Sequence, residues 1–170
     1  MLCFSFVTCT KSNVINEQND KYFGNCTIQK NGELNSYKAY GQLYNNKPDS
    51  LILTFEKWNG IILKEGISFI KIYKILGRQK INKTDFSNLK ATSIFSTLPE
   101  DGDVLCDQYF VFERDSLINN ITINSFNETT KEISGTFDVT LLVDLNRTIC
   151  NLQRVDTVRI RNGIFNTKIF

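Results

Sequence analysis

The stretch Ile133-Ser-Gly-Thr-Phe-Asp-Val-Thr-Leu-Leu-Val143 decides the fold of this chain. Its apolar side chains recur at every second residue, with serine, threonine and aspartate standing between them. Successive side chains of a β-strand point to opposite faces of a sheet, so a period of two predicts a strand with one buried face. Just before it, Ile121 and Ile123 alternate with polar residues, and the polar segment 127–131 can reverse the chain. The two stretches therefore predict an antiparallel hairpin.

The carboxyl-terminal segment predicts a second hairpin. Asn162-Gly163 is the preferred pair for a two-residue turn in which both central residues have positive φ. In that register Arg159 and Arg161 point to water. The core face is then expected to hold Val158, Ile160, Phe165 and Ile169.

Polar turns divide the rest of the chain into further short strands. Asn31-Gly32 marks a turn between two strands, and the segment 77–86 is interpreted as a loop. Residues 67–76 also fit helical spacing, but Gly66 and Gly77 bracket a length that suits a strand. Further strands are expected at 26–29, 37–44, 51–56, 61–63, 91–97 and 104–113.

The pattern contains about ten strands and no helix, which predicts an all-β fold. Strands that follow one another through short turns form an antiparallel meander or Greek key. We expect an antiparallel β-sandwich, with a closed, lipocalin-like meander barrel as the alternative. The pattern does not decide between the two.

Composition excludes several classes of function. The formal charge of +2, from 20 basic and 18 acidic residues, provides no large positive field for nucleic acid. The chain has no histidine, which excludes Ser-His-Asp and Cys-His catalysis and histidine-based zinc sites. It also lacks a Gly-rich phosphate loop and a G-x-S-x-G motif. We therefore expect no enzyme, no cofactor and no nucleic-acid partner.

The amino terminus predicts export. Residues 1–9 are apolar and the chain becomes polar at once after them. Phe6-Val7-Thr8-Cys9 resembles a bacterial lipobox, in which the cysteine receives lipid, although only eight residues precede Cys9. We infer a true start farther upstream. Residues 1–20 would then be the remnant of a lipoprotein signal and a flexible tether, and residues 21–170 a single β domain.

The carboxyl-terminal half resembles a known group of proteins. The matching stretches are Asp101 to Tyr109, Ile121 to Asn127, Glu132-Ile-Ser-Gly-Thr-Phe137 and Asp156 to Phe165. They are similar to small Bacteroidota lipoproteins of unknown function, which carry lipobox signals. The resemblance implies a lipid-anchored address on the cell envelope or outer membrane, and it implies no catalytic residue. Within the matching strand, Gly135 is expected to let a neighbouring backbone approach.

Three further groups of residues are candidates for sites. Asp101, Asp103 and Asp107 lie around a glycine turn and offer the oxygen ligands that calcium prefers, but the spacing misses the EF-hand pattern, and acidic turns are usually only solvated. Cys106 and Cys150 are a candidate disulfide in an oxidising compartment, although Cys26 leaves other pairings open. Tyr40, Tyr44 and Trp58 are a candidate platform for stacking sugar or peptide, although aromatic rings on a sheet more often pack against cross-strand neighbours.

The leading hypothesis is a non-catalytic, lipid-anchored envelope protein that binds or scaffolds an unknown protein or glycan. The first alternative is a lipocalin-like carrier of a small apolar ligand, since a meander of this length can close around a cavity. The second alternative is an inhibitor that presents the loop 77–86 to a hydrolase.

Overall fold

The computed structural model describes residues 24–83, 90–99, 105–146 and 154–170. Within these ranges the regular structure is ten β-strands and two short 3-10 turns, at Tyr44–Asn46 and Glu113–Asp115. The all-β prediction is confirmed. The described part of the chain contains no helix with the length and apolar character needed to cross a membrane.

The strands are β1 (Gly24–Lys30), β2 (Glu33–Leu43), β3 (Ser50–Asn59), β4 (Ile62–Tyr73), β5 (Gly77–Lys80), β6 (Thr92–Thr97), β7 (Gln108–Val111), β8 (Asn120–Phe126), β9 (Glu132–Val143) and β10 (Thr157–Lys168).

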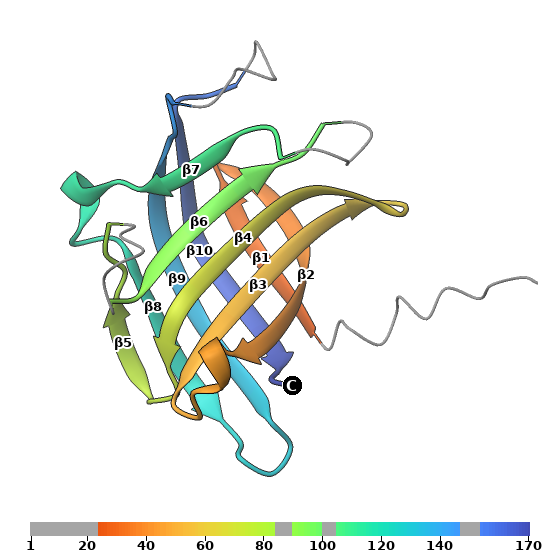
Figure 1. The fold of residues 1–170 in the computed structure, drawn as a ribbon, viewed down its shortest axis with the longest axis vertical. Helices are drawn as coiled ribbons and strands as arrows, with labels where there is room; N and C mark the ends of the chain where they lie inside the picture. The colour runs from red at the N-terminus through yellow and green to blue at the C-terminus, as the bar shows by residue number, and fades with distance from the viewer. Residues whose placement is uncertain (1–23, 84–89, 100–104, 147–153) are drawn as a thin grey trace, which may run out of the picture.

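Eight of these strands close into an antiparallel barrel in the order β1-β2-β3-β4-β6-β7-β9-β10, and β10 pairs back with β1 (Figure 1). β7 and β8 pair with successive parts of the same edge of β9, and β5 pairs with β8 outside the barrel. The closed barrel, and not the sandwich, is therefore the architecture. Closure also gives hydrogen-bond partners to the first and last strands, which would otherwise be exposed sheet edges.

The period-two pattern located most strands correctly. The stretch 133–143 lies in β9, its expected partner is β8, and the ambiguous segment 67–76 is strand up to Tyr73. The expected loop at 77–86 is wrong at its start, because Gly77–Lys80 forms β5. The expected strand at 104–113 is shorter in the structure, where β7 covers only Gln108–Val111.

The predicted hairpin at Asn162-Gly163 is wrong. β10 runs without a turn from Thr157 to Lys168, and Asn162 is the residue at which its pairing with both neighbours shifts register. Asn162 has φ 52°, whereas Gly163 is not among the glycines with positive φ, so the pair forms a β-bulge instead of a two-residue turn. The core side chains predicted around it are nevertheless right: Val158, Ile160, Phe165 and Ile169 are buried.

Phenylalanines fill the middle of the barrel. Phe55, Phe69, Phe95, Phe137 and Phe165 are each at most 1% exposed. The ring of Phe137 lies 5.2 Å from that of Phe55 and 4.7 Å from that of Phe69, measured between centroids. Such contacts are those of a packed aromatic core. Inward side chains alternate with outward ones along β2, β10 and most of β9, so one set of residues builds the core and the other set covers the outer wall.

At Gly135 a neighbouring strand lies very close to the backbone of β9, as the sequence led us to expect. A Cβ atom added there would lie 2.1 Å from the carbonyl oxygen of Thr122 on β8 and 2.7 Å from the ring of Phe165. The glycine thus lets β8 and the aromatic core approach β9 from two sides.

We expect Gly135→Ala to lower the free energy of unfolding by about 1–3 kcal/mol, because either β8 or Phe165 must move to admit the methyl group. Gly66→Ala is the matched control, since nothing lies within 4 Å of the added Cβ and the φ of Gly66 is not positive. Urea unfolding of both variants measures the difference. Equal stabilities would show that the contact at Gly135 relaxes at no cost.

Candidate functional site

Only Asp107 of the three acidic residues predicted to bind calcium lies within the described residues. Asp101 and Asp103 lie outside the described residues. Asp107 is 2% exposed and accepts a hydrogen bond from the guanidinium of Arg154 at 3.4 Å. No cluster of three or more potential metal ligands occurs in the described ranges. Asp107 is therefore turned inward to an arginine instead of outward to a solvated loop.

The cysteine predictions fall mostly outside the described chain. Cys9 and Cys150 lie there, so neither the lipid attachment nor the pairing of Cys106 with Cys150 is tested. Cys106 is buried, and Cys26 is a buried thiol of the core whose pKa is raised by burial. Cys26 therefore behaves as an apolar core residue.

The predicted aromatic platform comes together in part. The hydroxyl of Tyr40 on β2 donates to Glu56 Oε1 at 2.9 Å, and the indole Nε1 of Trp58 on β3 donates to Glu56 Oε2 at 3.1 Å. Tyr44 is directed elsewhere, because its ring lies 5.5 Å from the ammonium of Lys71. Two of the three residues thus share a carboxylate that the sequence analysis did not single out.

The Tyr40-Glu56-Trp58 cluster lies on the outer wall of the barrel and is itself largely covered. Glu56 is only 7% exposed, and Phe170 stacks against Tyr40 with 6.0 Å between ring centroids. Burial, followed by the nearby charge of Glu56, raises the pKa of Tyr40 to about 12, so its hydroxyl remains a donor at neutral pH. The cluster can offer aromatic edges to a sugar, but its carboxylate already serves to hold the two rings.

One end of the barrel interior is lined by charged side chains. Lys30 and Glu65 form an ion pair at 2.5 Å, and the hydroxyl of Tyr37 donates to the other Glu65 oxygen at 2.6 Å. Lys57 donates to the side-chain oxygen of Asn35 at 2.7 Å beside this pair. These residues continue the inward faces of β1, β2, β3 and β4 beyond the apolar core.

Opposite charges compensate each other at this end. Burial alone would raise the pKa of Glu65, but the hydrogen bonds from Lys30 and Tyr37 and the charges of Lys30 and Lys57 outweigh it and lower that pKa. Arg154 and Asp107 form a second pair nearby, with 11% and 2% of their side chains exposed. The charged groups at this end are therefore partnered with one another.

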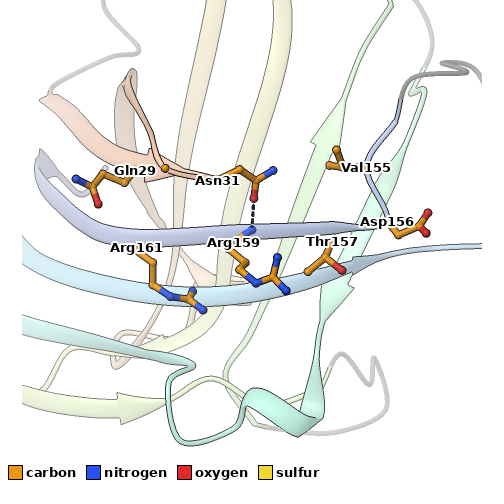
Figure 2. Close-up of a pocket in the computed structure, with 8 residues that line it drawn as sticks. Gln29, Asn31, Val155, Asp156, Thr157, Arg159 and Arg161 are labelled. Carbon is orange, nitrogen blue, oxygen red and sulfur yellow. Dashed lines mark hydrogen bonds between the residues drawn. The ribbon is translucent and has the colours of Figure 1, made fainter.

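A third feature is a hollow of about 550 Å³ on the outer wall, over β1 and β10. It is lined by Gln29, Asn31, Gly32, Val155, Asp156, Thr157, Arg159 and Arg161. Figure 2 shows Arg159 and Arg161 extending side by side from β10 across β9, with Asn31 on the other side of β10. The Asn31 side-chain oxygen accepts the backbone N–H of Arg159 at 2.8 Å, which joins the β1–β2 turn to β10.

Sequence reasoning placed Arg159 and Arg161 in water and assigned them no role. Arg159 and Arg161 are two residues apart, which places both side chains on one face of β10. This spacing is the feature of the sequence that could have pointed to a shared site. The hollow was not predictable, because it also requires the Asn31-Gly32 turn to lie beside β10, and only the pairing of β1 with β10 brings these distant parts of the chain together.

Comparisons with protein-family models, with curated proteins and with solved structures found no match for this chain.

The Lys30-Glu65-Tyr37 group makes the stability of the barrel sensitive to acid. Because folding lowers the pKa of Glu65, this carboxylate stabilises the fold above its unfolded pKa and loses that contribution as pH falls through the folded pKa. We expect Glu65→Gln to be less stable than the wild type at pH 7, and to lose less further stability between about pH 5 and pH 2. The measurement is urea unfolding at several pH values.

Glu132→Gln serves as the control, since its side chain is 54% exposed in a pair with Lys168. If the acid dependence of Glu65→Gln matched that of Glu132→Gln, the pair inside the barrel would contribute no more than one on the surface.

Proposed function

We propose that this chain is a non-catalytic binding module of the bacterial cell envelope, held to a membrane by lipid on Cys9. Its ligand, a protein or glycan, contacts the outer wall of the barrel and not the interior. The observation that carries this proposal is the aromatic core, because a barrel filled by its own side chains has only its outer surface to offer.

The aromatic core argues against the hypothesis that this protein carries a small apolar ligand. A lipocalin-like carrier needs a cavity along the barrel axis, where this chain has Phe55, Phe69, Phe137 and Phe165 in mutual contact. The ion pairs at one end of the interior add a second obstacle, because an apolar ligand entering there would break Lys30–Glu65. The carrier is therefore the less favoured function.

The arrangement of the ionisable groups favours binding over catalysis. Inside the barrel, Lys30 pairs with Glu65 and Arg154 with Asp107. On the outer wall, Glu56 holds two aromatic donors. A catalytic acid or base needs a perturbed group that faces a space for substrate. The hollow at Arg159 and Arg161 supplies mainly hydrogen-bond donors, which suit binding.

The geometry is compatible with a tether at one end of the barrel. β1 begins toward the end at which β2 finishes, since the two strands are antiparallel. At that end the turns 44–49 and 74–76 are joined by a hydrogen bond from Lys74 N to the Asp49 carbonyl oxygen. Ile75 and Leu76 are exposed there, at 61% and 68%. A lipid-held domain would place Ile75 and Leu76 on the side nearest to its membrane.

The inhibitor hypothesis gains no support from the fold. The segment expected as a projecting loop begins with β5, which is hydrogen-bonded along its length to β8. Arg78 in this strand donates to the carbonyl oxygen of Leu117 at 2.8 Å. A strand fixed in this way cannot adapt to a hydrolase active site as a free loop would.

The lipid anchor is tested by labelling. We expect radiolabelled palmitate to enter the chain when it is made in a bacterial host behind a complete lipoprotein export signal, and Cys9→Ala to abolish both the label and membrane retention. Cys26→Ala is the control, because Cys26 is buried in the folded domain and should not affect the label. The anchor is excluded if the wild type takes up no label and Cys9→Ala stays in the membrane fraction.

The outer-wall proposal predicts that fluorescent fatty acids show no saturable binding to the Cys9→Ala protein, because the phenylalanine core leaves them no cavity. A fluorescence titration measures this, with a lipocalin of known cavity as the positive control. Stoichiometric binding that Phe137→Trp weakens would instead place an apolar ligand inside the barrel.

A further inference from the structure

We propose that the hollow over β1 and β10 is a binding site for an oxyanion, a carboxylate or a phosphate group, with Arg159 as its main contact. The inference does not depend on the lipid anchor. It rests on a count of the hydrogen-bonding atoms that line the hollow and on the way in which the β-bulge fixes one of its two arginines.

The side-chain oxygens of the two amide residues in this hollow are already occupied. Gln29 Oε1 accepts a hydrogen bond from the side chain of Asn162 at 2.9 Å, and Asn31 Oδ1 accepts the backbone N–H of Arg159 at 2.8 Å. The amide nitrogens of Gln29 and Asn31 make no hydrogen bond in the described part of the chain. These two residues therefore present donors, and not acceptors, to a ligand.

The arginines add more donors. Arg161 is held by hydrogen bonds from Nη1 to the carbonyl oxygens of Val139 and Ile160 and from Nη2 to the hydroxyl of Thr140, all between 2.7 and 2.9 Å. A guanidinium has five N–H groups, so two of those on Arg161 remain. Arg159 is exposed, and its guanidinium makes no hydrogen bond or ion pair with the described residues.

The bulge at Asn162 explains why Arg161 is fixed while Arg159 is free. The register of β10 shifts at this point against both β1 and β9, which redirects the side chain before the bulge. Arg161 thereby reaches the backbone of β9, and Asp138 accepts the N–H of Asn162 at 2.9 Å. A fixed guanidinium beside a free one suits an anion, because the free side chain can adjust while the other keeps its place.

The surrounding charges leave a positive balance in the hollow. Asp156 is the acidic residue among its lining, against the two arginines. Asp138 lies nearby, but it forms no ion pair with Arg161 within 4 Å in the described structure. An arrangement of donors with a net positive charge favours an oxyanion over a neutral sugar or a cation. The hollow is also large enough for a ligand the size of a monosaccharide.

The test uses the full-length chain with Cys9→Ala and titrates it, at low salt, with glucuronate, inorganic phosphate and glucose. Backbone amide chemical shifts of Asn31, Arg159 and Arg161 provide the readout. We expect glucuronate or phosphate to shift these signals saturably and glucose to leave them unchanged. Binding by glucuronate alone would assign the site to a sugar carboxylate, and equal binding by phosphate would assign it to any small oxyanion.

The matched variants are Arg159→Ala and Arg78→Ala, which change the net charge equally. Arg159→Ala is expected to weaken binding about tenfold or more, because it removes the free guanidinium. Arg78→Ala should leave binding unchanged, since Arg78 lies on β5 and donates to Leu117. The proposal is overturned if no anion shifts these signals up to about 50 mM, or if the two variants weaken binding equally.

Discussion

Closure of the barrel by β1 and β10 is the constraint on which the rest of the structure depends. Residues 25–30 pair with residues 160–166, so almost the full described length of the chain lies between the strands that meet. Once eight strands form a closed ring, the geometry sets the enclosed volume, which either side chains or a small ligand can occupy. Inward-facing phenylalanines from β3, β4, β6, β9 and β10 fill it.

The filled interior determines where function can reside. Because apolar side chains occupy the middle and paired charges occupy one end, the barrel offers its loops and its outer wall to other molecules. The wall is not uniform. On β2 and β3 the carboxylate of Glu56 accepts hydrogen bonds from two aromatic side chains. Over β1 and β10 the amide oxygens of Gln29 and Asn31 already accept hydrogen bonds, while donors remain. The two surfaces are therefore chemically opposite, and only the second has spare hydrogen-bonding capacity suited to an anion.

Glycines and asparagines with unusual backbone requirements connect the core to this surface. Gly163 is required because a Cβ atom there would lie 2.7 Å from the ring of Phe137, and Asn162 beside it takes the left-handed conformation that forms the bulge. The aromatic core thus sets the path of β10, and the path of β10 sets the position of Arg161. A surface arginine is positioned through the packing of the interior.

The sequence by itself determined most of the strands and their inward faces, since alternation along a strand is a local property that a single segment carries. It identified β9, β8 and the core residues of β10, and it brought Tyr40 and Trp58 into one candidate cluster. Only the tertiary structure decided that the sheet closes, that Glu56 links the two aromatics, and that Asn162-Gly163 is a bulge and not a turn. The physical reason is that one asparagine in the left-handed conformation fits either geometry. The strands on both sides of it, β1 and β9, make the choice, and they come from opposite parts of the chain.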